Sequence, residues 1–366
     1  MKALTVGGAM IDTIALIDSD RIERMGLANA DTGFLLLEEG RKTEARDISA
    51  HCGGGAVNAA VSMARLGLDT ATLVKLGKDA RADQILARLA DEGVSTRFAV
   101  RDGRLPTGAS VMVAAHDRNA AIFTFRGANT LLQTADLRDD AFAMDLVYIS
   151  GLSNESAACF GDLVRRAGAA GAMVATNPGL RQLTARQDAF YGCLDGVGIL
   201  SINRAEGDAL VPSLIAEFGE GGPALPLDAG EPPYSLVGRG FASGGFQMSA
   251  RAFFQAILSK GPGRVLVTAG RDGSYLADSA GLHHCPVLEV EVAGTAGAGD
   301  AFGSTFAALT CQGLPVEDAL RAAAINAASV VGHIDTQTGL LTRDALLDRV
   351  AQLKDTLPIR FWAWGE

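Results

Sequence analysis

Residues 294–305 read Gly294-Thr295-Ala296-Gly297-Ala298-Gly299-Asp300-Ala301-Phe302-Gly303-Ser304-Thr305. Small residues lead up to one carboxylate, Asp300, after which Phe302, Phe306 and Leu309 follow at helical spacing. This pattern predicts a glycine turn that enters a helix. The free N–H groups of a first helical turn and the helix dipole favour an anion at that place. A carboxylate there repels an anion, so we expect Asp300 to accept a proton instead.

A second glycine cluster has a different chemistry. The run Gly53-Gly54-Gly55-Ala56-Val57-Asn58 is followed by Ala59, Met63 and Leu66 at helical spacing and then by Gly67, which predicts a helix that stops at Gly67. The Asn58 side chain offers a donor and an acceptor, which suits neutral hydroxyl groups. One site for hydroxyls and one for phosphates together predict phosphoryl transfer.

Short apolar runs alternate with amphipathic helical segments along the chain. We expect strands at Ala71–Leu76, Leu146–Ile149, Ala172–Thr176, Gly198–Ile202 and Val265–Thr268. A glycine, asparagine or aspartate lies near the end of each. The alternation predicts an α/β fold with a mostly parallel sheet between two layers of helices and with chemistry at the strand ends.

Two pairs of segments are typical of hairpins. Phe34–Leu37 and Thr43–Ile48 flank Glu39-Gly40, and Ser110–Ala114 and Ala121–Phe125 flank residues 116–119. We expect them to form a small lid, from about 13–50 and 107–126, on a single domain that spans residues 1–366. Residues 205–250 are rich in glycine, proline and acids, which predicts an insertion or loop region.

Composition excludes several classes of partner. The 366 residues are 48% hydrophobic and carry a net charge of -10, without a basic run of the kind that nucleic acid or an anionic membrane needs. No stretch approaches the ~20 apolar residues that span a bilayer. The five cysteines are scattered and lack CxxC spacing. These features favour a reducing compartment, and we expect a cytoplasmic location.

Common nucleotide motifs do not fit. Gly77-Lys78 is followed by Asp79, so it is no P-loop. The first expected strand leads into Gly7-Gly8-Ala9-Met10, which lacks the glycine spacing of a dinucleotide fold.

The motifs together resemble the ribokinase-like, or PfkB, family of carbohydrate and nucleoside kinases. The resemblance runs in order from Val6 to Leu340 and leaves out residues 205–250. It rests on the segments Gly7–Asp12, in which the first strand is expected to end at Asp12, Gly53–Asn58, Thr107-Gly108, Gly127-Ala128-Asn129, Asn177-Pro178-Gly179, Asn203–Glu206, Thr268–Gly273 and Gly297–Asp300.

The resemblance implies a ribokinase-like α/β fold with a β-hairpin lid and a kinase that uses ATP and Mg²⁺. The γ-phosphate would pass to a hydroxyl, expected to be primary, of a sugar or sugar derivative. Asp300 is then the catalytic base, and the anion hole is Gly297, Ala298 and Gly299. Substrate contacts are expected from Asp12, Gly53, Gly54 and Asn58. Nucleotide contacts are expected from Asn203, Glu206, Thr268, Gly270, Gly273 and Asn326, with Glu206 also holding the metal through water. The resemblance also implies a homodimer formed through the lid.

Two positions depart from the family pattern. Gly294 stands where the family usually has an aspartate that belongs to a monovalent-cation site, which puts K⁺ activation in doubt. Thr305 replaces a smaller residue of the following helix. A protein that has lost catalysis and only senses a sugar or nucleotide is therefore an open alternative.

The acceptor also has an alternative. The stretch Arg24–Arg41 is longer than a minimal ribokinase lid and resembles the adenosine-kinase branch, so the substrate could be a nucleoside. Gly55 stands where ribokinases carry a longer polar residue, which argues against free ribose.

Overall fold

The computed structural model describes residues 1–365 except 19–22, 27–32, 37–39, 41, 116–119, 223 and 227–234. The described helices are α1 (Gly55–Arg65), α2 (Ala80–Asp91), α3 (Phe160–Ala169), α4 (Leu180–Ala185), α5 (Gln187–Tyr191), α6 (Arg204–Phe218), α7 (Leu236–Arg239), α8 (Ala250–Ser259), α9 (Ala298–Cys311), α10 (Val316–Val331) and α11 (Arg343–Gln352). The described strands are β1 (Lys2–Gly7), β2 (Met10–Ile17), β3 (Glu23–Gly26), β4 (Gly33–Leu36), β5 (Asp47–Gly53), β6 (Asp69–Leu76), β7 (Val100–Arg101), β8 (Gly108–Ala115), β9 (Ala120–Phe125), β10 (Leu146–Ser150), β11 (Met173–Asn177), β12 (Ile199–Asn203), β13 (Phe241–Ser243), β14 (Phe246–Met248), β15 (Arg264–Thr268), β16 (Ser274–Ala277), β17 (Gly281–Cys285) and β18 (Arg360–Ala363).

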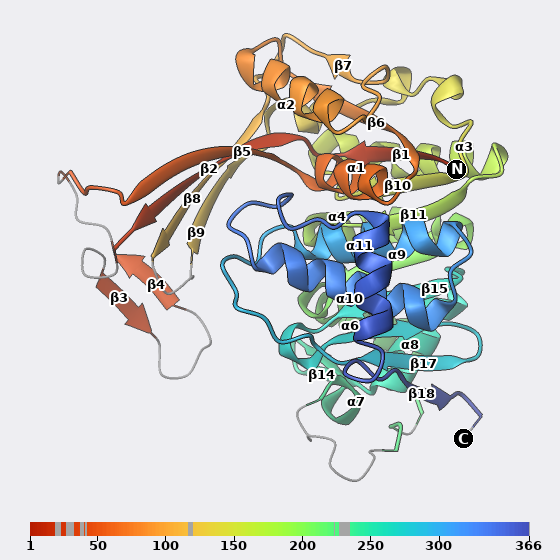
Figure 1. The fold of residues 1–366 in the computed structure, drawn as a ribbon. Coiled ribbons are helices and arrows are strands. Elements are labelled where there is room, and N and C mark those ends of the chain that lie inside the picture. Colours follow the sequence, from red (N-terminus) through yellow and green to blue (C-terminus); the bar gives the residue numbers. More distant parts are fainter. Residues whose placement is uncertain are drawn as a thin grey trace.

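A large sheet runs through the body of the molecule (Figure 1). Among the described residues its strand order is β18-β17-β16-β15-β12-β11-β10-β1-β6-β7. Strands β15 through β7 of this order are parallel, whereas β16, β17 and β18 are antiparallel. The mostly parallel sheet predicted from the apolar runs is therefore confirmed, and each of the five predicted runs forms one of its strands.

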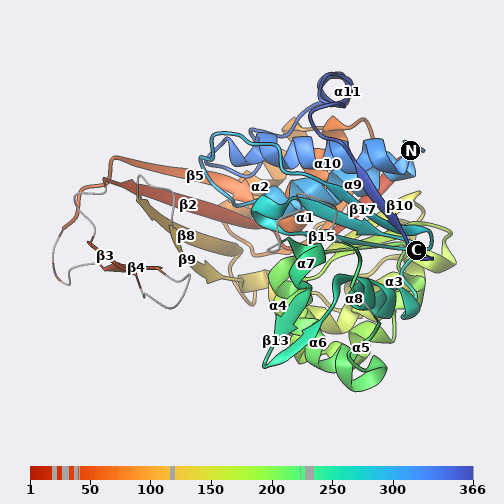
Figure 2. The ribbon, with the colours of Figure 1, turned by 90° about the horizontal axis from the view of Figure 1, so that it is seen from below.

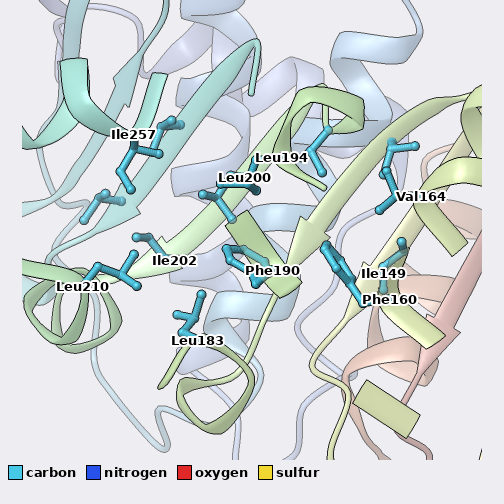
Figure 3. Packing of buried hydrophobic residues seen from close by; sticks show 14 of the residues in the cluster. Ile149, Phe160, Val164, Leu183, Phe190, Leu194, Leu200, Ile202, Leu210 and Ile257 are labelled. Carbon is cyan, nitrogen blue, oxygen red and sulfur yellow. The ribbon is translucent and has the colours of Figure 1, made fainter. Parts of the chain in front are cut away.

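Helices cover both faces of this sheet because its strands are apolar on both sides. Along β10, Leu146 and Tyr148 face one cluster of buried side chains, and Val147 and Ile149 face the other. Helices α1, α9, α10 and α11 supply the first cluster. Helices α3, α4, α5, α6 and α8 supply the second, part of which is drawn in Figure 3. The period of two in the strand thus produces the three-layer architecture.

A separate four-stranded sheet projects from the body (Figures 1 and 2). Its order is β5-β2-β8-β9, and we call it the lid sheet. The predicted pairing of Ser110–Ala114 with Ala121–Phe125 is confirmed by the antiparallel pair β8 and β9. That this sheet closes over a substrate, and that the whole chain is one domain, remain predictions.

The other predicted hairpin is wrong. The strand β4 pairs with β3, and β5 pairs with β2 over seven residues instead of with Phe34–Leu37. The long register between β2 and β5 satisfies more backbone groups than a hairpin about Gly40 would, and local turn signals do not reveal it. Glu39, which belonged to that predicted turn, and the turn at 116–119 lie outside the described residues.

The expectation of a loop over residues 205–250 is also wrong in part. Residues 204–218 form α6, whose Leu210, Val211 and Leu214 are fully buried. Their packing outweighs the helix-breaking effect of Pro212. In the described part of residues 219–250, the chain forms α7 and the antiparallel pair of β13 and β14 before α8 begins. Among the described helices, none is long and apolar enough to cross a bilayer.

Candidate active site

The turn before α9 has the geometry that its glycines predict. Gly297 has a φ of 80°, in the left-handed region, and a Cβ there would lie 2.7 Å from the Cβ of Thr336. The helix begins at Ala298, so the N–H groups of its first turn point out of the helix toward the expected anion. A Cβ at Gly299 would meet nothing within 4 Å, so there is open space in front of this turn.

Asp300 lies half-buried in the first turn of α9. The amide nitrogen of Asn58 donates to its Oδ2 over 2.8 Å. Burial raises the pKa of Asp300 above its usual value, the Asn58 hydrogen bond opposes this rise, and the charge of Asp12 adds to it. A carboxylate whose pKa is raised is a better proton acceptor than an ordinary aspartate.

Two other glycine positions let the chain approach Asp300. A Cβ at Gly55 would lie 3.2 Å from Oδ1 of Asp300 and 2.8 Å from the Cβ of Ser150. A Cβ at Gly7, where β1 ends, would overlap the Ser150 hydroxyl. The ends of β1 and β10 and the start of α1 are therefore pressed together beside the carboxylate, and the position of Ser150 here had no signal in the sequence.

Asn58 is used differently from the prediction. It is 4% exposed, and its amide oxygen accepts from Thr336 Oγ1 over 2.8 Å and from Gln337 Nε2 over 3.2 Å. Since its nitrogen faces Asp300, both ends of the amide are occupied within the protein. The hydroxyl contact expected of Asn58 remains a prediction, and its observed partner is the carboxylate.

Asp12 lies on the lid sheet rather than at the end of the first strand, which ends at Gly7. This corrects the sequence prediction, because Gly8 and Ala9 separate β1 from β2. Ser110 donates to Asp12 Oδ1, and a Cβ at Gly53 would overlap the other carboxylate oxygen. Burial raises the pKa of Asp12, and the Ser110 hydrogen bond opposes the rise. The neighbouring Gly54, with φ 100°, lets the chain leave β5 for α1.

The residues expected at the nucleotide lie where β12 and β15 end. Asn203 is the register partner of Thr268, so both stand at one edge of the sheet. Asn203 and Glu206 form a reciprocal capping box at the start of α6, in which each side chain accepts from the other's backbone N–H. Burial raises the pKa of Glu206, the bonds to Asn203 oppose this, and the charge of Asp300 adds to it.

Gly270 and Gly273 form the turn between β15 and β16. Both have positive φ, and a Cβ at Gly273 would overlap the carbonyl oxygen of Cys285, whereas one at Gly270 would meet nothing within 4 Å. Gly273 is thus required by the turn, and Gly270 borders open space.

Asn326 makes its hydrogen bonds within the protein interior. It is fully buried in α10, where its nitrogen donates to Thr305 Oγ1 over 2.8 Å and its oxygen accepts from the Leu341 N–H over 2.9 Å. The nucleotide contact expected of Asn326 remains a prediction. Thr305, which departs from the family pattern, is the residue that accepts the hydrogen bond from the Asn326 amide nitrogen.

The motif Gly127-Ala128-Asn129 holds the base of the lid sheet. The side chain of Asn129 accepts from the Ala9 N–H over 3.0 Å and donates to the Ala9 carbonyl over 2.8 Å. A Cβ at Gly108 would overlap the Asn129 amide nitrogen. The three motifs around Ala9, Gly108 and Asn129 therefore fix the link between β1 and β2, which carries Asp12.

The donor chemistry fits a magnesium ion near Glu206. Its carboxylate is a hard oxygen ligand of the kind that Mg²⁺ takes through water, and it lies in the first turn of α6, directly after β12. Within the described part of the chain, no group of three or more His, Cys, Asp and Glu side chains is arranged to hold a metal directly.

Known proteins resemble the chain over most of its length. The deoxyribokinase of Salmonella typhi is 26% identical over 332 residues, which cover 89% of this chain and 94% of that protein. The ribokinase of Thermotoga maritima has the same fold, with a TM-score of 0.72 at 18% identity over 96% of this chain and 99% of that one. The Arabidopsis thaliana ribokinase complexed with ribose and ATP gives a TM-score of 0.69 at 21% identity, over 95% and 98% of the two chains. The ribokinase-like fold expected from the motifs is therefore confirmed.

The family model for pfkB carbohydrate kinases matches residues 19–343, which include every expected site residue except Asp12. The chain belongs to the PfkB family of carbohydrate kinases.

Proposed function

We propose that this protein transfers the γ-phosphate of ATP to a hydroxyl group, expected to be primary, of a sugar or sugar derivative. The observation that carries the proposal is the position of Asp300, on a glycine turn at the N-terminus of α9, where Asn58 donates to its carboxylate. Thr336 borders both this turn and Gly53, whose Cβ position lies against the Asp12 carboxylate. A carboxylate between an anion site and a candidate hydroxyl site is suited to accept the hydroxyl proton.

The reaction follows from the charges. The hydroxyl oxygen forms a bond to the γ-phosphorus, the bond from that phosphorus to the β-phosphate oxygen breaks, and the proton passes to Asp300. The N–H groups of residues 297–299 hold the transferring group, and one such donor contributes about 3 kcal/mol in comparable oxyanion holes. Magnesium held through water by Glu206 would neutralise charge on the β- and γ-phosphates. Asp12 and the backbone of Gly53 and Gly54 would bind the hydroxyls of the acceptor.

The substrate class is supported by the family and by the deoxyribokinase relative. Gly55 cannot carry a side chain without meeting Ser150 and Asp300, so this chain lacks the longer polar side chain that the resemblance leads us to expect of ribokinases at this position. We therefore propose 2-deoxyribose and related sugar derivatives as the first acceptors to assay, and nucleosides as the second class.

The experiment measures acceptor-dependent release of ADP over a panel of sugars, sugar acids and nucleosides. Saturable ADP release with one acceptor, and phosphate found on its hydroxyl, is the expected result. A sugar that raises the melting temperature without any turnover would instead identify a sensor. Turnover with nucleosides alone would identify the other branch of the family.

A further inference from the structure

The orientation of the Asn58 amide is fixed by two donors from one turn. Thr336 Oγ1 and Gln337 Nε2 both donate to Asn58 Oδ1, over 2.8 Å and 3.2 Å. The amide nitrogen is therefore turned toward Asp300, to which it donates over 2.8 Å. A flipped amide would place its oxygen against the carboxylate, and two acceptors repel each other.

Two arginine side chains hold the turn that contains Thr336 and Gln337. Arg88 Nε donates to Gln337 Oε1 over 3.1 Å, and Arg65 donates to the Gln337 carbonyl over 2.9 Å. Both arginines pair with Glu92. Gln337 also donates to the carbonyl of Cys52 in β5 over 2.9 Å. Thr336 and Gln337 are 8% and 3% exposed, so the protein dictates where their donors point.

The orientation of the Asn58 amide affects the pKa of Asp300, because other neighbours of this carboxyl raise that pKa. Among the described residues, the ionisable groups whose pKa is linked to the charge of Asp300 or that act on it are Asp12 of β2, Glu206 of α6 and the buried Tyr148 of β10. Asp12 raises the pKa of Asp300, and Asp300 raises those of Glu206 and Tyr148. Asn58 is the hydrogen-bond donor that opposes the rise at Asp300.

We propose that Thr336 and Gln337 are positioning residues for the base: by fixing the Asn58 amide they keep a donor on Asp300 and so hold its carboxylate ready for the substrate proton. This inference rests on the proposed function, because only a reaction that needs Asp300 as base responds to it.

The test is the pH dependence of kcat/KM for the best acceptor. Thr336→Val and Gln337→Met each leave the Asn58 oxygen one of its two donors, and the double variant leaves neither. We expect the acidic limb of the profile to move up by about one pH unit in the double variant and by less in each single variant. The activity at the high-pH plateau should change less than the activity at pH 6.

Two further variants separate positioning from general packing. Thr336→Ser keeps the hydroxyl donor and should return the limb toward its wild-type pH. Gln312→Met removes the bond that Gln312 donates to the Leu66 carbonyl and the bond that it accepts from Arg343 Nε. Neither belongs to the network around Asn58, so this variant should leave the limb in place.

The inference is overturned if the variants lose activity equally at every pH, or if the limb stays at its wild-type position. If the double variant fails to fold, the two single variants still test the inference, because each is expected to move the acidic limb by less than one pH unit. A wild-type protein without turnover on any acceptor overturns the proposed function first, so the two failures are distinguishable.

Discussion

Asp300 takes its properties from its neighbours more than from its own chemistry. The carboxylate is half-buried, its pKa is raised by burial and by Asp12, and Asn58 supplies the hydrogen bond that limits the rise. In the proposed reaction the ionised form is the active one. Activity should therefore fall as the pH drops through a pKa that lies above the ordinary aspartate range.

Asp300→Asn removes the base and keeps the shape of the side chain. We expect turnover to fall by about 10²–10⁴-fold, the usual contribution of a general base. Nucleotide affinity, measured by calorimetry with a non-hydrolysable ATP analogue, should stay near that of the wild type because the N–H groups of the turn are unchanged. A variant that keeps most of its turnover would contradict the assignment.

The same substitution should stabilise the fold at neutral pH. A carboxyl whose folded-state pKa is raised favours the protonated form, so its contribution to stability is present below the unfolded-state pKa and is lost as the pH rises through the folded-state pKa. Asparagine does not ionise and avoids that loss. Thermal unfolding should show a higher Tm for Asp300→Asn at pH 8, and a smaller difference at pH 4. Equal Tm differences at both pH values would contradict the raised pKa.

The glycine at position 294 leads us to expect no activation by monovalent cations. A Cβ at this position would lie 3.3 Å from the His333 carbonyl oxygen and 3.5 Å from that of Ile334, so a carboxylate here would join two backbone oxygens. Without it, we expect equal kcat/KM in KCl and in choline chloride at the same ionic strength. Gly294→Asp should introduce a dependence on K⁺. Strong stimulation of the wild type by KCl would show that the glycine leaves the site intact.

At the scale of elements, the link between β1 and β2 holds the lid sheet to the body. Ala9 is fully buried, and Asn129 satisfies both its N–H and its carbonyl. Leaving buried backbone groups unpaired costs about 1–3 kcal/mol for each.

Asn129→Leu should therefore lower the free energy of unfolding in urea by about 2–6 kcal/mol. It should also raise KM for the acceptor, because β2 carries Asp12. Thr130→Val is the matched control, since it removes one bond, to the Gly127 carbonyl, within the same turn. If Asn129→Leu is as stable as Thr130→Val, Asn129 does not hold the link between β1 and β2.

At the scale of the whole molecule, the lid sheet has one apolar face exposed. Val111 pairs with Phe123 across β8 and β9, and alternation puts both on the face opposite Asp12 and Ser110. The exposed fractions are 66% for Ile48, 45% for Val111, 61% for Phe123 and 50% for Phe125. We propose that a second copy of the chain covers this face, as the family resemblance implies.

Phe123→Ser should shift sedimentation velocity from dimer toward monomer, because it removes the most exposed aromatic side chain of this face. Phe246→Ser is the control, since Phe246 is 48% exposed on β14, away from the lid sheet (Figure 1). A wild type that sediments as a monomer at micromolar concentration would contradict the dimer.

Much of this molecule follows from local sequence. Apolar runs predict the strands of the parallel sheet, and the glycine turns predict the starts of α1 and α9, because burial and positive φ are properties of single segments. Pairing between distant segments is different. The partner of β5, the helix within 205–250 and the interior position of Asn326 depended on contacts across the fold.

A three-layer α/β protein with one carboxylate at a glycine turn can be predicted from single segments, because it depends on periodicity and on backbone freedom. The way in which that carboxylate is held depends on contacts between distant segments. Asn58 lies 242 residues from Asp300, and Thr336 lies 278 residues from Asn58. No pattern of spacing encodes such hydrogen bonds, because they exist only when the packing of α1, α9 and the turn after α10 brings the donors within reach.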